Sequence, residues 1–150
     1  MIRILVPVDG SALALDAVHH ALALVRGGLS ATLVLANVQE PASFYELATR
    51  DSDLIAAAAV DAGQDLMASA VALVQAAGVP HETEVALGEV AATLVDLAED
   101  NGCGLIVIGA QGQGAISSAL LGSVSQAVVR LSAVPVTIVK HREADEQEGA

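Results

Sequence analysis

The sequence predicts a single α/β domain, a Rossmann-like open sheet of five parallel strands with helices on both faces. Short runs rich in Ile, Val and Leu recur along the chain, as in Ile2–Val8 and Leu105–Ile108. Segments in which apolar residues recur at helical spacing lie between these runs. The 150 residues are 54% hydrophobic, with one Phe, one Tyr and no Trp, so we expect a core of Ala, Val, Leu and Ile.

The first half of the chain supplies two strands and two helices. The apolar run Ile2–Val8 predicts the first strand, and Ser11 is placed to cap the helix that follows it. Two glycines end that helix at 27–28, before a second strand over 31–38. A long connection over 39–52 then leads to an Ala-rich helix over 53–77. The expected apolar faces are Leu15, Val18, Leu22 and Val25 in the first helix, and Leu66, Ala70, Leu73, Val74 and Ala77 in the second.

The second half supplies three strands and two helices. Alternation predicts the third strand at Thr83–Leu87, and the fourth strand is Leu105–Ile108. The last helix starts near Ser123, which we expect to cap it, and Val134–Val139 is the fifth strand. The expected apolar faces of the two helices are Val90, Leu94 and Leu97, and Val124, Val128 and Leu131. The domain spans 1–141, and the acidic residues 142–150 predict a flexible tail.

Composition excludes several classes of function. A net charge of −12 argues against nucleic-acid binding, which needs Lys and Arg to neutralise phosphates. The single Cys103 excludes an internal disulfide framework and is interpreted as a small buried hydrophobe. The N-terminal apolar run is too short for a signal peptide. The segment 101–129 has no charged residue, but its six glycines and its Gln and Ser residues argue against membrane insertion. We therefore expect a cytoplasmic protein.

Two loops follow strands at places where a ligand could bind. One is 7–11, after the first strand, and the other is the glycine-spaced loop 109–123, after the fourth. Ligands of open parallel sheets bind beyond the carboxyl ends of the strands. Glycines let backbone N–H groups approach an anion, and the start of a helix adds partial positive charge. If the first and fourth strands are neighbours, these loops face each other across a crevice.

The glycine spacing excludes two common nucleotide motifs. Gly109 and Gly114 have the spacing of a P-loop, but Ala115 stands where the lysine belongs. The dinucleotide fingerprint that starts at Gly112 fails because Ser117 replaces its last glycine. What remains is a pattern with two residues between Gly109 and Gly112, and nine more before Gly122.

That pattern, followed by Ser123, resembles the nucleotide-binding signature of the universal stress protein family. The resemblance extends over nearly the whole chain and includes 6–11, the Gly88-Glu89 turn, 105–109 and 134–136. It implies a sheet of strand order 3-2-1-4-5 with ATP in the crevice between the first and fourth strands. AMP or ADP would suit the same site.

The resemblance also implies a role for individual residues. Asp9 would meet the ribose or adenine, Val38 would pack on the adenine, and Gly109 would approach the ribose and phosphates. The loop has Gln and Ser where many family members carry Arg or Lys. A triphosphate would then be neutralised by Mg²⁺ bound through the phosphates rather than by protein ligands, or be held by backbone dipoles alone. The implied nucleotide-binding residues are Pro7, Val8, Asp9, Val38, Ile108, Gly109, Gly112, Gly122, Ser123, Val124 and Ser125.

Simpler interpretations stay open for some of these residues. Asp9 could be only a turn residue before Ser11, and Gly112 and Gly114 could be loop glycines without a ligand. The adjacent His19 and His20 lie about 100° apart on a helix and cannot share one metal ion. His81 and His141 have no partner nearby in sequence, and no Cys/His spacing suggests zinc.

These observations favour an adenine-nucleotide-binding stress or regulatory protein whose ligand alters dimer or partner contacts. The protein partner is not specified by the sequence. One alternative is an interaction module of the same fold without nucleotide, and another is a slow ATP hydrolase, although the sequence shows no catalytic set. The apolar last strand, Val134–Lys140, is expected at a sheet edge, and the resemblance implies a homodimer built through it.

Overall fold

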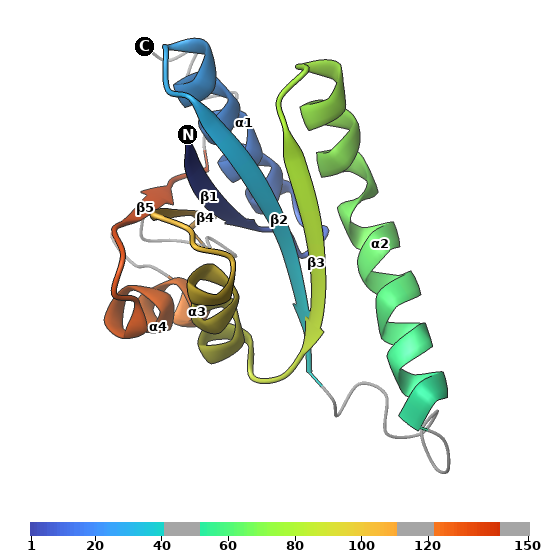
Figure 1. Cartoon of the computed structure of the whole chain (residues 1–150). Coiled ribbons are helices and arrows are strands. Elements are labelled where there is room, and N and C mark those ends of the chain that lie inside the picture. Colours follow the sequence, from blue (N-terminus) through green and yellow to red (C-terminus); the bar gives the residue numbers. More distant parts are fainter. Residues whose placement is uncertain (41–51, 111–121, 142–150) are drawn as a thin grey trace.

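The computed structural model describes residues 1–40, 52–110 and 122–141 as one α/β layered domain (Figure 1). The connection 41–51, most of the glycine loop (111–121) and the acidic tail (142–150) lie outside the described residues. The elements in chain order are β1 (Ile2–Pro7), α1 (Ala12–Arg26), β2 (Ala31–Gln39), α2 (Ser52–Ala76), β3 (His81–Leu87), α3 (Val90–Asp100), β4 (Leu105–Gly109), α4 (Ser123–Leu131) and β5 (Val136–Val139).

The five strands form one parallel sheet in the order β3-β2-β1-β4-β5, as the resemblance implied. The central strand, β1, pairs with β2 from Ile2 opposite Ala31, and with β4 from Ile4 opposite Leu105. The strand order reverses at β1, because β2 lies on one side of it and β4 on the other. The carboxyl ends of β1 and β4 therefore lie side by side, which is where ligands bind in folds of this kind.

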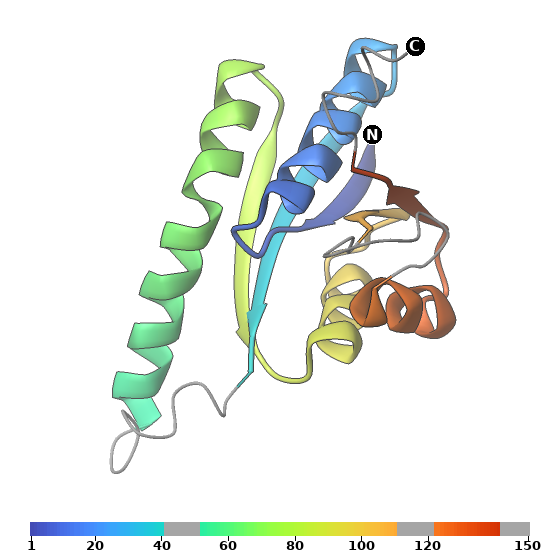
Figure 2. The ribbon, with the colours of Figure 1, turned by 180° about the vertical axis from the view of Figure 1, so that it is seen from behind.

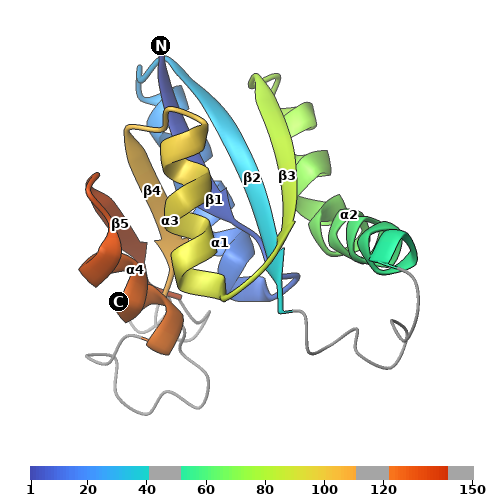
Figure 3. The ribbon, with the colours of Figure 1, turned by 60° about the horizontal axis from the view of Figure 1, so that its bottom comes forward.

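Alternating residues of the strands fill two separate cores. Ile4 and Val6 pack with α1 and α2 on one face of the sheet, and Leu5 packs with α3 and α4 on the other. Figure 2 shows the molecule from behind the view of Figure 1, and Figure 3 shows α3 and α4 on one side of the sheet with α1 and α2 on the other. The buried residues are almost all Ala, Val, Leu and Ile, as predicted, with Met67 and Cys103 added.

The structure corrects the predicted apolar face of α2. Leu66 is 41% exposed, whereas Met67, Ala70 and Val74 are buried against the sheet. Helix α2 approaches the sheet closely at Gly63, where a Cβ atom would lie 2.7 Å from both methyl carbons of Val85. This contact sets the rotation of the helix. Two other predicted face residues are also exposed: Ala77, which lies just after the end of α2, and Leu131, at 48%, in the last position of α4.

Two strand boundaries also differ from expectation. The third strand begins at His81 rather than Thr83, because an edge strand pairs through its backbone even where its side chains are polar. The fifth strand begins at Val136 rather than Val134, because Pro135 has no N–H to donate to the ladder. The remaining predicted boundaries agree within a residue or two.

An ion pair closes the amino end of the sheet, opposite the candidate site. The Arg3 guanidinium donates two hydrogen bonds to the Glu82 carboxylate, at 2.7 and 3.1 Å, and its Nε donates to the carbonyl of Asn101. These hydrogen bonds hold the pKa of Glu82 below its ordinary value. Cys103 is buried nearby, as predicted, and burial raises the pKa of its thiol.

The uncharged stretch 101–129 includes β4 and the first part of α4 rather than one long helix. A different segment, Ala56–Ala76 of α2, is long and apolar enough to cross a membrane by length and composition alone. That criterion is also met by core helices of soluble proteins. Met67, Ala70 and Val74 of this segment are buried against the sheet, although only 28% of its apolar stretch is buried.

Candidate functional site

A cavity of about 200 Å³ opens at the carboxyl ends of β1 and β4. Its wall comes from both predicted loop regions and from both helical layers. Small-ligand pockets are commonly 300–1,000 Å³, so this cavity suits part of a nucleotide, such as a base with its sugar. The described residues that line it are Pro7, Val8, Asp9, Ser11, Leu13, Ala14, Ala36, Val38, Val90, Leu94, Ile108, Gly109, Val124 and Ser125.

The turn between β1 and α1 is built by side chains that also line the cavity. The Ser11 backbone N–H and hydroxyl donate hydrogen bonds to Asp9 Oδ1 at 2.9 and 2.6 Å. The Ser11 Oγ accepts from the N–H of Ala14 at 3.2 Å, so Ser11 caps α1 as predicted. Gly10 has a φ of +91°, a conformation that favours glycine. The turn is therefore fixed before any ligand arrives.

Backbone contacts hold the three strands that form the floor. Val8 extends beyond β1 and donates its N–H to the carbonyl of Ala36 at 2.7 Å. Gly109 lies against α1, where a Cβ atom would meet the carbonyl group of Leu13. The absence of a side chain at 109 thus allows β4 and α1 to approach each other beside the cavity.

The start of α4 differs from expectation in one detail. Gly122, with φ −70° and ψ 164°, is the N-cap residue and makes no side-chain capping hydrogen bond, while Ser123 already lies in the helix. The prediction that Ser123 caps the helix is therefore wrong. Ser125 is 1% exposed and its hydroxyl donates to the carbonyl of Gly122 at 3.1 Å. Val124 and Ser125 bring the first turn of α4 to the cavity.

Most of the predicted site residues meet at this cavity. Those that line it are Pro7, Val8, Asp9, Val38, Ile108, Gly109, Val124 and Ser125. Gly122 and Ser123 lie next to the lining at the start of α4 but are not part of it. Gly112 lies outside the described residues. The structure therefore brings the two predicted loop regions together at one cavity.

Sequence reasoning missed the contribution of α3. Val90 and Leu94 line the cavity from the helix that follows the Gly88-Glu89 turn. Their apolar spacing indicated a core face, and Leu94 is indeed buried. The signal that could have found them was the turn itself, which was noted only as part of the family resemblance.

The lining carries little charge. Within the described ranges, Asp9 is its only charged residue, and no Lys, Arg or His belongs to it. Arg130 and Lys140 are exposed and lie outside the lining. The described part of the chain has no group of three or more His, Cys, Asp or Glu side chains that could hold a metal ion. Polar recognition in the cavity must then come from the Asp9 carboxylate, hydroxyls, backbone groups and the N-terminus of α4.

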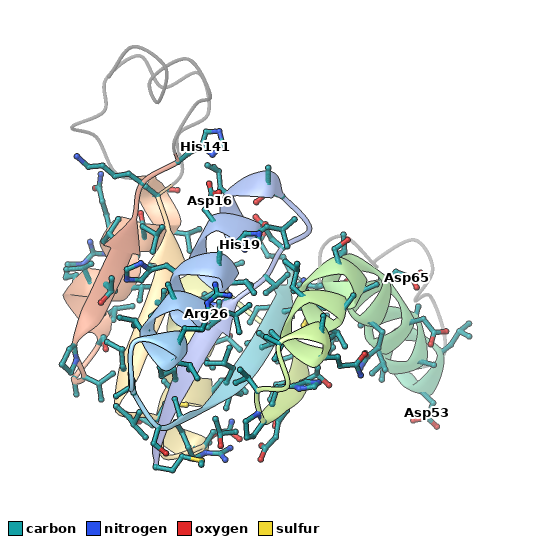
Figure 4. The ribbon with its side chains drawn as sticks, turned by 90° about the horizontal axis from the view of Figure 1, so that it is seen from above. Asp16, His19, Arg26, Asp53, Asp65 and His141 are labelled. Carbon is teal, nitrogen blue, oxygen red and sulfur yellow. The ribbon has the colours of Figure 1, made fainter. Side chains whose placement is uncertain are left out.

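One histidine contacts a residue that lies far from it in the sequence. His141 Nδ1 lies 2.6 Å from Asp16 Oδ2, which joins the end of β5 to α1 across 125 positions. Figure 4 shows the two side chains pointing toward each other, with His19 farther along α1. His141 is therefore held by a long-range contact with α1.

Comparisons with known proteins agree with this architecture. Residues 1–140 match the Universal stress protein family. The chain is 30% identical over 139 residues to Universal stress protein MJ0531 of Methanocaldococcus jannaschii, covering 92% of this chain and 81% of that protein.

Two solved structures extend the likeness to three dimensions. A universal stress protein in complex with cAMP is 27% identical, with a TM-score of 0.67 and coverage of 93% and 96% of the two chains. An Arabidopsis thaliana family protein with AMP bound has the same TM-score at 21% identity, with coverage of 97% and 95% of the two chains. At this identity the likeness is one of fold. The family match, the relative and the sheet order together show that this chain belongs to the universal stress protein family.

Proposed function

We propose that this protein is a stress-response regulator that binds an adenine nucleotide in the cavity between β1 and β4. The observation that carries the proposal is the convergence of Asp9, Val38 and Ser125 on one cavity at the switch point of the sheet. The base and sugar would lie against Val8 and Val38, with Asp9 at the ribose or adenine. The phosphates would extend toward the start of α4.

The chemistry at α4 supports an anion at that end. A helix N-terminus offers unpaired N–H groups and partial positive charge, and Gly122 makes no side-chain capping bond there. Hydrogen bonds to charged groups contribute roughly 1.5–3 kcal/mol each. Three or four of them, less ordering costs, approach the about 8 kcal/mol of a micromolar ligand.

ATP with Mg²⁺ is the nucleotide that the resemblance to the family's signature implies, and AMP or ADP would use the same base and sugar contacts. The described lining supplies no cation, so a triphosphate would bring its own Mg²⁺ through the phosphate oxygens. The relative whose structure holds cAMP supports an adenine ligand in this fold. As a regulator, the protein would act in the cytoplasm through dimer or partner contacts that depend on the bound nucleotide.

Because the described lining supplies no cation, a second candidate is a dimeric interaction module that binds no nucleotide. Titration calorimetry of the whole protein with MgATP, ATP, AMP and cAMP separates the two. The first proposal expects micromolar to millimolar binding of at least one adenine nucleotide. Absence of heat and of thermal stabilisation at millimolar concentrations of all four would favour the module.

A variant at α4 tests where the phosphates bind. Gly122→Val places a branched side chain at the helix N-cap and should abolish binding. Ala133→Val adds comparable bulk at an exposed position after α4 and should leave affinity unchanged. Equal affinity of the two variants would place the site elsewhere.

A further inference from the structure

A chain of amide hydrogen bonds connects the cavity loop to α2. Asn37 is 2% exposed, and its Nδ2 donates to the carbonyl of Val8 at 2.9 Å. Its Oδ1 accepts from Gln39 Nε2 at 2.8 Å, and the same Nε2 donates to the carbonyl of Ala59 in α2 at 3.1 Å. Two side chains of β2 thus connect the end of β1 to the middle of a helix.

Close packing holds α2 at the same place. A Cβ atom at Gly63 would lie 2.7 Å from the methyl carbons of Val85 and 3.0 Å from Asn37 Oδ1. One turn along the helix, the Leu66 side chain covers the β1–α1 turn, so that a Cβ at Gly10 would lie 2.7 Å from its Cδ2. Helix α2 therefore touches the cavity loop directly through Leu66 and indirectly through Asn37.

The buried amide makes this arrangement sensitive to displacement. An unpaired amide in an apolar environment is costly, so Asn37 must keep both partners or the local structure must rearrange. Asn37 lies beside Val38 in sequence and bonds to Val8, and both valines line the cavity. Lifting α2 would withdraw the carbonyl of Ala59 from Gln39 and the helix backbone from Asn37. The wall that holds the base would then lose its fixed position.

We infer that Asn37 and Gln39 are positioning residues that couple nucleotide binding in the cavity to the seating of α2 on the sheet. The inference rests on the proposed function for its ligand. The site is then regulated through α2, because a ligand that fixes the loop 8–10 also holds α2 more firmly on the sheet. By thermodynamic reciprocity, a contact that loosens the packing of α2 on the sheet lowers the affinity of the cavity for the ligand.

Hydrogen exchange with and without saturating AMP or MgATP tests the coupling. In the unaltered protein, nucleotide should slow exchange of the α2 amides from Ala59 to Met67, although this segment lies outside the lining. Gln39→Met keeps the length of the side chain but removes the donor to Asn37 and Ala59. It should abolish the ligand-induced slowing and lower affinity about fivefold or more, the lower end of typical coupling between sites. Unchanged slowing in this variant overturns the inference.

Two variants at glycine positions distinguish a loss of coupling from a general loss of stability. Gly63→Ala forces α2 away from Val85 and Asn37 and should lower affinity although Gly63 does not line the cavity. Gly27→Ala makes the same change at the end of α1, where the new Cβ lies 3.4 Å from the nearest atom. It should change neither affinity nor α2 exchange. Equal affinities for the two variants count against the inference.

The ligand-free protein supplies a test that does not depend on the proposed function. Without nucleotide, Gln39→Met should speed exchange both in α2 and in the β1–α1 turn, at Gly10 and Ser11. If no adenine nucleotide binds, the proposed function fails, yet speeding at both places still supports the link between loop and helix. Speeding confined to α2 overturns that link.

Discussion

Asp9 and Ser11 are joined by a 2.6 Å hydrogen bond between carboxylate and hydroxyl, and both residues line the cavity. The same Oδ1 atom accepts the N–H of Ser11, so one carboxylate oxygen organises the whole turn. The structural role proposed for Asp9 and the ligand role are thus compatible. A residue that shapes the turn also presents its charge to the cavity.

Two substitutions at Asp9 separate these roles. Asp9→Asn retains an acceptor oxygen for the turn, whereas Asp9→Ala removes it and should destabilise the protein by about 1 kcal/mol. If Asp9 binds the ribose or adenine, Asp9→Ala should also weaken nucleotide binding about 10-fold or more, since hydrogen bonds to charged groups contribute roughly 1.5–3 kcal/mol. Urea unfolding and calorimetry measure the two effects. Loss of stability with unchanged affinity would leave Asp9 as a turn residue only.

Gly109→Ala tests the close approach of β4 and α1. The added Cβ would collide with the carbonyl oxygen of Leu13 and lie 3.0 Å from its carbonyl carbon, so α1 or β4 must shift. We expect a loss of about 1–3 kcal/mol in stability, typical of overpacking, together with weaker nucleotide binding because Gly109 lines the cavity.

The matched control is Gly104→Ala, just before β4. Its Cβ would lie 3.3 Å from two side-chain carbons of Ile2, which can move aside. Thermal unfolding and calorimetry on both variants make the comparison. A cost for Gly109→Ala no larger than for Gly104→Ala would mean that the contact with Leu13 does not constrain the site.

Local patterns were enough to predict the order and type of the elements. The run Ile2–Val8 is apolar because both faces of β1 are buried, and Ser11 caps α1 because a hydroxyl there reaches the N–H of Ala14. The rotation of α2 could not be predicted in this way. Its Ala-rich sequence is apolar on more than one side, and the close approach of Gly63 to β3 selects the buried face.

The residues that line the cavity also differ in how well the sequence predicts them. Residues on the loops after β1 and β4 were predictable, because their types and spacing carry the chemistry. The apolar spacing of Val90 and Leu94 did not predict their place at the cavity, because an apolar residue beside a ligand has the same pattern as one in the core. Only the turn before α3 gave a signal. Asn37 did give a signal, an amide within the apolar run Ala31–Val38, but its partners Val8 and Gln39 are fixed only by the sheet.

The geometry of β5 gives a sharp test of the proposed homodimer. The carbonyls of Pro135 and Val139 accept hydrogen bonds from Ile106 of β4 and from Ala110, just after β4. Since backbone groups alternate in direction along a parallel strand, those of Ile138 point away from β4, toward the open edge. Light scattering should give about twice 15.0 kDa for the unaltered protein. Ile138→Pro, which removes the outward N–H, should yield monomers.

Ile138→Ala is the control, because Ile138 also packs against the core beneath α3 and α4. This variant loses the side chain but retains the outward N–H, so it should be less stable and still dimeric. Circular dichroism verifies that both variants are folded. Monomeric unaltered protein at micromolar concentration, or a dimer that survives Ile138→Pro, would contradict pairing through β5.

The ion pair between Arg3 and Glu82 predicts a pH dependence of stability. Its hydrogen bonds lower the pKa of Glu82 in the folded protein, so the pair stabilises the fold above the carboxyl's unfolded pKa, about 4.3. That stabilisation is lost as the pH falls through the lower, folded pKa. Glu82→Gln should therefore lower the Tm at pH 7 but not at acidic pH, and 1 M salt should reduce the difference. Arg3→Gln and the double variant complete the cycle, and a Tm difference that persists at pH 2.5 would assign the effect to packing instead.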